Sequence, residues 1–114
     1  MIDLVRLAAG RRHEQGLERR VIAALRTIHD PELPVNIYDL GLIYDLAVDE
    51  AGRVDIRMTL TAPGCPVAQS FPAQVEQAVA KIEGVTSAHV EIVWDPPWDP
   101  SRMSEAARLQ LGLA

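Results

Sequence analysis

Residues 42–60 hold two runs in which the side chains on one side of an extended chain are apolar. The apolar positions of the first run are Leu42, Tyr44, Leu46 and Val48, and those of the second run are Val54, Ile56, Met58 and Leu60. This period of two predicts half-buried β-strands, and the glycine-containing link at residues 50–52 predicts that they form a hairpin. An antiparallel pair with one apolar face needs a cover, so we expect helices on that face.

Two helices are predicted from apolar stripes at steps of three and four residues. The first stripe, within residues 14–28, consists of Leu17, Val21, Ala24, Leu25 and Ile28. The second stripe, within residues 67–83, consists of Val67, Phe71, Val75, Val79 and Ile82. We expect the first helix to stop near His29, because Asp30 precedes a proline, and we expect Pro72 to bend or delay the second helix.

The other elements are shorter. Residues 37–41 are expected to form one helical turn closed by glycine. Residues 85–94 predict a third strand, and the proline-rich segment 95–100 is expected to be extended. Residues 104–111 predict a short helix with Ser104 as its N-cap.

The order α-β-β-α-β with a terminal helix predicts an α/β (α+β) fold. We expect a small two-layer sandwich with the helices on one face of a small sheet. Residues 14–114 are expected to form a single domain, and residues 1–13 an N-terminal extension. The alternation does not tell whether the third strand pairs with the first or the second, so both orders stay open.

Charge and composition exclude several classes of protein. Residues 30–100 carry twelve acidic and three basic side chains, so this part of the chain would repel a nucleic-acid backbone. No apolar run approaches the roughly 20 residues that span a bilayer, so no membrane partner is expected. One cysteine excludes an internal disulfide and fits a reducing compartment, so we expect the cytoplasm. The six arginines of residues 1–29 are interpreted as a solvated helix face rather than a surface for an acidic partner.

Cys65 is the residue with the sharpest chemical signal. It lies between Gly64 and Pro66, close to the predicted start of the second helix. The free N–H groups and positive dipole end of a helix N-terminus stabilise a thiolate, and a glycine leaves the sulfur uncovered. The alternative is a small buried hydrophobic residue, which is the role of most lone cysteines.

Three carboxylates, Asp30, Glu32 and Asp39, fall on predicted loops. The hairpin brings the start of its first strand near the end of its second, so these loops are expected at the same end of the sheet as Thr61 and Cys65. An acid there would serve as a metal ligand or a proton acceptor, and Thr61 would hydrogen-bond the cysteine loop. The alternatives are loop capping for the acids and ordinary β-propensity for the threonine.

The other candidate residues are aromatic. Trp94 and Trp98 bracket Asp95-Pro96-Pro97, so the two rings lie on a stiff segment. They form a partner-binding surface in one interpretation and cap the open face of the sheet in the other. The three histidines of the chain make no metal-binding pattern.

Several motifs in order make the sequence resemble a known family. They are Asp30-Pro31-Glu32-Leu33-Pro34-Val35, Asp39-Leu40-Gly41-Leu42, Thr59-Leu60-Thr61 followed by Gly64-Cys65-Pro66, Asp95-Pro96-Pro97-Trp98, and Met103-Ser104-Glu105 with Ala107-Arg108 and Leu111-Gly112. The chain is similar in these positions to the iron–sulfur cluster assembly domain family. That family includes SufT and PaaD-like proteins and the eukaryotic cytosolic cluster-targeting factor. PaaD-like members usually carry further cysteines near the C-terminus, and this chain has none after Cys65.

The resemblance implies a role in maturing iron–sulfur proteins alongside the SUF machinery, through Cys65 as the key thiol with Asp30, Glu32 and Thr61 as its neighbours. The partners it implies are an iron–sulfur scaffold, client apoproteins and a second copy of the chain in a homodimer. Clusters normally need about four thiolate-type ligands. A labile iron–sulfur cluster or iron on Cys65 would therefore be shared with the second subunit or with a partner.

Two other functions stay open. The first is a thiol enzyme with Cys65 as nucleophile and Glu32 or His29 as base. The second is an adaptor in which Trp98 and the arginine-rich first helix bind partners and Cys65 is incidental. We expect a factor that is not an enzyme.

Overall fold

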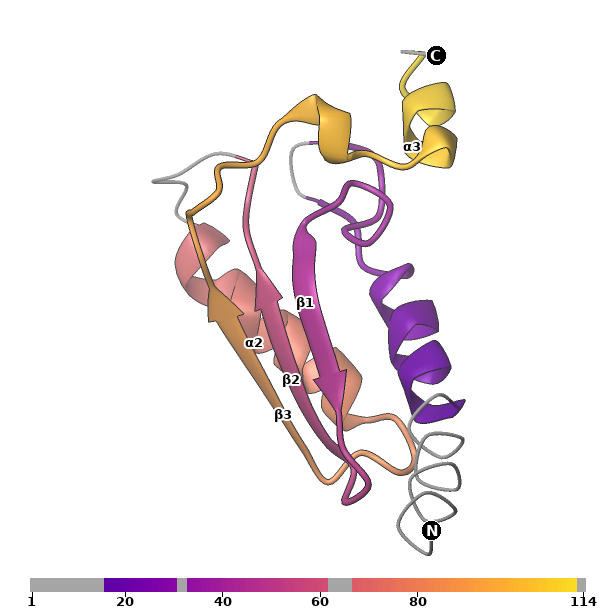
Figure 1. Cartoon of the computed structure of the whole chain (residues 1–114), viewed down its shortest axis with the longest axis vertical. Helices are drawn as coiled ribbons and strands as arrows, with labels where there is room; N and C mark the ends of the chain where they lie inside the picture. Colours follow the sequence, from indigo (N-terminus) through magenta and orange to yellow (C-terminus); the bar gives the residue numbers. More distant parts are fainter. Residues whose placement is uncertain (1–15, 31–32, 62–66, 113–114) are drawn as a thin grey trace, which may run out of the picture.

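The computed structural model describes residues 16–30, 33–61 and 67–112 (Figure 1). Its first helix covers residues 16–25. The elements that follow are β1 (Ile43–Val48), β2 (Arg53–Met58), α2 (Val67–Ala80), β3 (Ser87–Ile92), the 3-10 turn η1 (Pro100–Arg102) and α3 (Glu105–Gln110). No helix in these ranges is long and apolar enough to cross a bilayer.

The three strands form one sheet in the order β1-β2-β3. β1 and β2 are antiparallel, which confirms the hairpin, and β2 and β3 are parallel. The pairing order that the sequence left open is therefore settled, since the third strand lies beside the second. The hairpin turn depends on Gly52, whose φ of 85° is a left-handed conformation that favours glycine.

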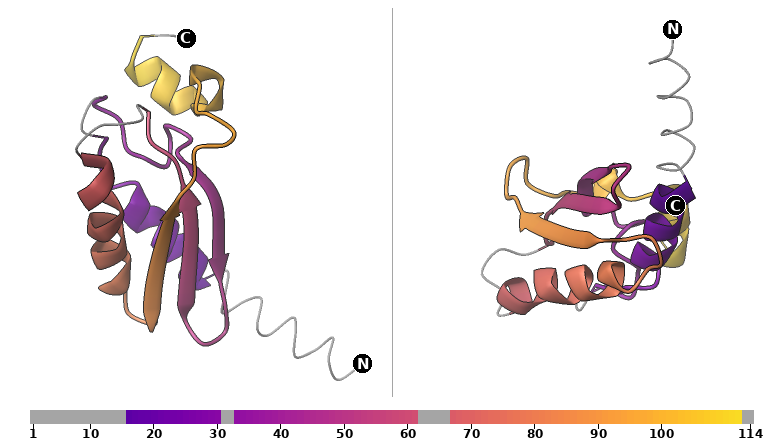
Figure 2. Two further views of the ribbon diagram at one scale, coloured as in Figure 1. Left: turned by 90° about the vertical axis from the view of Figure 1, so that its left-hand side faces the viewer. Right: turned by 90° about the horizontal axis from the view of Figure 1, so that it is seen from below.

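The sheet and the helices form two layers. α2 runs along one face of the sheet, and the first helix completes this layer on the β1 side (Figure 2). The buried core lies between the layers and contains most of the described residues of the two predicted helix stripes and the inward side of β2, with Leu17, Val21, Leu25, Val54, Ile56, Met58, Phe71, Val75 and Val79 among its members. The opposite face of β2 is exposed and polar, so the prediction of helices on one face only is confirmed.

Element ends differ from the predicted ones by a few residues. The first helix ends at residue 25, because Thr27 and Ile28 already donate to carbonyls three residues back, as in a tighter terminal turn. α2 ends at Ala80 rather than near residue 83, and β3 is shorter at both ends than residues 85–94. The start of α2 is not delayed by Pro72, which lies inside the helix in its second turn.

One irregularity in β1 changes which side chains face the core. The register between β1 and β2 shifts between Ile43 and Asp45. Ile43 therefore packs against the core together with Leu46 and Val48, whereas Tyr44 is not part of it. The strict alternation that grouped Tyr44 with the apolar side of β1 was wrong at this position, because a β-bulge adds a residue to one strand.

The chain after β3 forms a segment that we call the C-terminal strap, residues 95–112. It crosses the end of the sheet from the β3 side, turns through η1 and ends with α3 (Figure 1). The side-chain oxygen of Ser104 accepts a hydrogen bond of 3.1 Å from the backbone N–H of Ala107, which confirms the predicted N-cap. Met103 and Ala107 are buried in the core, so the strap is an integral part of the domain.

Candidate functional site

Three segments meet at the end of the sheet where β1 begins and β2 ends. Ile43 pairs with Met58, and the N–H of Thr59 extends this ladder by donating to the carbonyl of Leu42 at 2.9 Å. On the other side of β2, the N–H of Val93 donates to the carbonyl of Met58 at 2.8 Å. The loop before β1, the chain after β2 and the chain after β3 therefore share one end, as the hairpin predicted for the first two.

Asp30 lies at the start of the loop that precedes β1 and is only 7% exposed. Its Oδ2 accepts a hydrogen bond of 2.9 Å from the backbone N–H of Leu33, and its own N–H donates to the carbonyl of Val35 at 3.1 Å. The Asp30 carboxylate therefore caps this loop, which is the structural role that the sequence offered as the alternative.

Asp39 also stabilises its own loop. The side-chain amide of Asn36 donates to Asp39 Oδ2 at 2.8 Å, and the Asp39 backbone N–H donates to Asn36 Oδ1 at the same distance. Arg26, in the turn directly after the first helix, lies 4.0 Å from Asp39 Oδ2 and 4.9 Å above the ring of Tyr38. Arg20, on the first helix, donates to the carbonyl of Glu83 at 2.6 Å, so both Arg20 and Arg26 have partners within the domain.

The two threonines after β2 differ in their environment. Thr59 is fully buried, and its hydroxyl Oγ1 has no hydrogen-bond partner among the described residues. Thr61 is half-buried. A buried hydroxyl without a partner costs free energy, so Thr59 is an unusual position at the site. The sequence alone could not reveal this, because alternation gives a side chain's direction and not its partners.

The two tryptophans differ in how exposed their side chains are. Trp98 is half-buried and packs against the core, and its indole N–H donates to the carbonyl of Leu40 at 2.7 Å. Trp94 is 44% exposed. Trp98 therefore packs within the domain, and of the two rings Trp94 is the one exposed enough to be a contact surface.

Glu32, Gly64 and Cys65 lie outside the described residues, so their place beside Asp30 and Thr61 stays a prediction. His29, the other base of the thiol-enzyme alternative, is exposed, and its backbone forms a bridge with Asn36. Within the described ranges, no group of three or more His, Cys, Asp or Glu side chains is placed to hold a metal ion.

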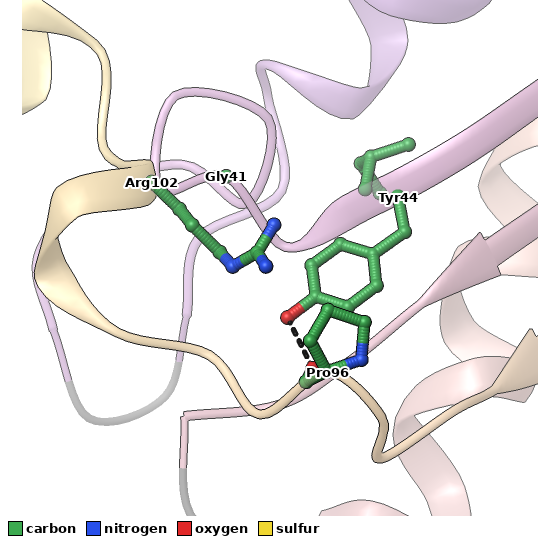
Figure 3. Close-up of a pocket in the computed structure, with 5 residues that line it drawn as sticks. Gly41, Tyr44, Pro96 and Arg102 are labelled. Atoms are coloured by element: carbon green, nitrogen blue, oxygen red, sulfur yellow. Dashed lines mark hydrogen bonds between the residues drawn. The ribbon is translucent and has the colours of Figure 1, made fainter.

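Tyr44 and Arg102 are two residues near this end that sequence reasoning missed. The Tyr44 hydroxyl donates to the carbonyl of Pro96 at 2.8 Å, and the Arg102 guanidinium lies 4.7 Å above its ring (Figure 3). An open pocket of about 420 Å³ lies here, lined by Gly41, Ile43, Tyr44, Pro96 and Arg102. Partial burial raises the pKa of Tyr44, and the nearby Arg102 charge opposes this rise.

The sequence of this domain matches a known family. The family described as "Iron-sulfur cluster assembly protein" matches residues 18–92, which include most of the first helix, the sheet and α2. The chain belongs to this family, as the motif resemblance implied. The matched region ends at the last residue of β3, so the C-terminal strap lies beyond it.

Three relatives carry a more specific name. A protein from Porphyromonas gingivalis named Fe-S protein maturation auxiliary factor is 44% identical, with 83% of this chain and 90% of that protein covered. The Fe-S protein maturation auxiliary factor YitW from Bacillus subtilis is 43% identical, with 88% of this chain and 98% of that protein covered. The maturation auxiliary factor SufT from Staphylococcus aureus is 41% identical over 75% of this chain and 97% of its own.

Solved structures agree with the fold. A crystal structure of a domain of unknown function from Bacillus anthracis superposes with a TM-score of 0.80 at 37% identity, covering 89% of this chain and 96% of that one. A conserved hypothetical protein from Thermotoga maritima gives a TM-score of 0.68 at 42% identity, covering 81% and 90%. The first match includes most of this chain.

Proposed function

We propose that this protein is an auxiliary factor in the maturation of iron–sulfur proteins, acting through Cys65 and without catalysing a reaction itself. The observation that carries the proposal is the 41–44% identity to three maturation auxiliary factors over at least nine-tenths of their lengths. Identity over whole lengths makes a shared role more credible than a shared fold alone, because one fold supports many functions.

The cysteine count limits how the protein could handle its cargo. An iron–sulfur cluster takes about four thiolate-type ligands. The chain has one cysteine, so a cluster bound through Cys65 needs ligands from a second subunit, a partner or a small thiol. Shared ligation of this kind makes a cluster labile, which suits transfer to a client. An adaptor that never holds iron fits the same count.

The partners we propose are an iron–sulfur scaffold and client apoproteins in the cytoplasm. We further propose that the protein acts as a homodimer, because two copies would bring two Cys65 thiols to one cluster. Light scattering on the purified protein measures this directly. A mass of one chain across the micromolar range would contradict the dimer.

The deciding experiment compares Cys65→Ala and wild type in a strain that lacks its own maturation factor. The readout is the activity of a reporter [4Fe–4S] enzyme, with Gln77→Ala, an exposed position on α2, as the control variant. We expect Cys65→Ala to abolish support and Gln77→Ala to retain it. Full reporter activity with Cys65→Ala would overturn the role of the thiol.

A second experiment separates a carrier from an adaptor. The purified protein is incubated anaerobically with ferrous iron, sulfide and a thiol, and bound iron and visible absorption are measured. A cluster that forms in wild type and is absent from Cys65→Ala would support the carrier. Support of the reporter without a cluster in vitro would favour the adaptor.

A further inference from the structure

The C-terminal strap makes a set of hydrogen bonds with the loop that precedes β1. We call residues 33–42 the 33–42 loop. Three strap donors reach three of its backbone carbonyls: Trp98 Nε1 to Leu40 at 2.7 Å, the Ser104 N–H to Asp39 at 2.8 Å, and Gln110 Nε2 to Pro34 at 2.9 Å. These acceptors lie at both ends of the loop, so the strap holds it along its length.

The close approach of the two segments depends on a glycine. Gly41 has a φ of 81°, and a side-chain Cβ at this position would overlap the backbone carbonyl of Arg102. The loop and η1 therefore touch backbone to backbone. Contact of this kind fixes a loop more firmly than contact through long flexible side chains, because no rotamer can relax it.

The 33–42 loop in turn contacts two residues of the candidate site. Leu33 donates to the Asp30 carboxylate at 2.9 Å, and Leu42 accepts from the N–H of Thr59 at 2.9 Å. The loop also carries Asp39. A displacement of this loop would therefore move Asp30 and release one backbone partner of Thr59.

The strap is also attached to β1, the strand that follows the loop in the sequence. The Tyr44 hydroxyl donates to the carbonyl of Pro96, and Arg102 stacks on the Tyr44 ring (Figure 3). These contacts fix the strap to β1 on both sides of Trp98 in the sequence. Trp98 and Gln110 are thus presented to the loop from a segment that is itself held in place.

We propose that the C-terminal strap is the positioning element of the site: Trp98 and Gln110 hold the 33–42 loop, and with it Asp30, at the end of the sheet. The strap lies beyond residues 18–92, the region that the family model matches. The proposal rests on the proposed function only for its maturation readout. Trp98 and Gln110 are positioning residues, since each donates a hydrogen bond to a backbone carbonyl of the loop.

Two pairs of matched variants test the proposal in the full chain. Trp98→Phe keeps an aromatic ring and removes the N–H donor, and Trp94→Phe makes the same change at an exposed tryptophan. Gln110→Met removes a donor at similar length, and Gln110→Lys restores one. Hydrogen–deuterium exchange is followed at amides of the 33–42 loop, such as those of Leu40 and Leu42, and at amides of α2 as an internal reference.

We expect loop exchange to rise about threefold to tenfold in Trp98→Phe and in Gln110→Met, the range set by losing one hydrogen bond. Exchange in α2 should not change, and Trp94→Phe and Gln110→Lys should behave as wild type. We call Trp98→Phe and Gln110→Met the loss variants, because each removes a donor. A loop that exchanges at the wild-type rate in both loss variants would overturn the proposal. Equal rises in the loop and in α2 would also overturn it, because they would indicate global loosening.

The maturation assay then separates the proposal from the function on which it rests. Lower reporter activity in the loss variants, restored by Gln110→Lys, supports a positioning role. If the loop exchanges faster in the loss variants but reporter activity is unchanged, the positioning role is overturned. The Cys65→Ala variant still tests the proposed maturation function in that case. If Cys65→Ala retains full activity, the proposed function fails, and the exchange data still decide whether the strap holds the loop.

Discussion

The carboxylate of Glu76 on α2 accepts a hydrogen bond of 2.8 Å from the backbone N–H of Val90 on β3. β3 has a neighbouring strand on one side only, so its outward N–H groups face away from the sheet. Such unpaired edges are sites where another strand can add and start aggregation. Glu76 therefore joins the helix layer to the sheet and blocks one position of this edge.

Replacing Glu76 by alanine removes this acceptor and leaves the Val90 N–H on an open edge. We expect Glu76→Ala to lower the free energy of unfolding by about 1.5–3 kcal/mol, the range for hydrogen bonds to charged groups. Glu76→Gln retains an acceptor oxygen and should lose less. Urea unfolding measures both, with Gln77→Ala as the control on the same helix. A Glu76→Ala midpoint equal to that of wild type would contradict the role of the carboxylate.

Gly41 is required by the contact between the 33–42 loop and the strap. Alanine there meets two penalties: a left-handed backbone and an overlap with the Arg102 carbonyl. We expect Gly41→Ala to lower the free energy of unfolding by about 3 kcal/mol or more, since the left-handed backbone alone costs about 1–2 kcal/mol. Thermal and urea unfolding both measure this loss.

Gly112 supplies the matched control for the Gly41 prediction. It has a similar φ of 75°, but nothing lies within 4 Å of a Cβ built there. Gly112→Ala therefore carries the conformational penalty without the overlap. Equal losses in the two variants would mean that the approach of Arg102 does not constrain Gly41.

Much of the fold could be predicted, because binary patterning fixes which face of an element is buried. The stripe with Leu17, Val21 and Leu25 and the alternation of Val54, Ile56 and Met58 are both in the observed core. Patterning does not fix which strands are neighbours, so the parallel pairing of β2 with β3 came only from the structure. The bulge that turns Tyr44 away from the core also leaves no mark in an alternating pattern.

The site was predicted less completely than the fold, for a physical reason. The strap contacts depend on backbone carbonyls, such as those of Pro34 and Leu40, which every residue type possesses. No sequence motif encodes such an acceptor, so the partner of Trp98 could not be named in advance. The capping role of Asp30 was open from the start, because its side chain next to a proline fits a turn as well as a ligand set.

Thr59 offers a test of a buried polar group without a partner. Valine has nearly the same shape and lacks the hydroxyl, so Thr59→Val removes a desolvation cost without opening a cavity. We expect the free energy of unfolding to rise by about 1 kcal/mol. Thr86→Val is the control with the opposite sign, because the Thr86 hydroxyl donates to the carbonyl of Ala51 at 2.8 Å. A loss of stability in Thr59→Val like that in Thr86→Val would show that the Thr59 hydroxyl is bonded.

The attachment of the strap to β1 is expected to be sensitive to alkaline pH. The pKa of Tyr44 is raised above 10.0, chiefly because partial burial disfavours the phenolate. Because the pKa of Tyr44 is higher in the folded than in the unfolded state, the contribution of its neutral phenol to stability is fully present below pH 10. This contribution is lost as the pH rises through the pKa of Tyr44 in the folded state. The phenolate also has no proton to donate to the Pro96 carbonyl.

We therefore expect the absorbance of tyrosinate in wild type to include one residue that ionises above pH 10, and Tyr44→Phe to abolish that step. The chain has only two tyrosines, so Tyr38→Phe isolates the Tyr44 signal. Above pH 10 the stability of wild type should fall more steeply than that of Tyr44→Phe, which has no proton to lose at this position. Ionisation of Tyr44 at or below pH 10 in the Tyr38→Phe protein would contradict the effect of partial burial and of the hydrogen bond to Pro96.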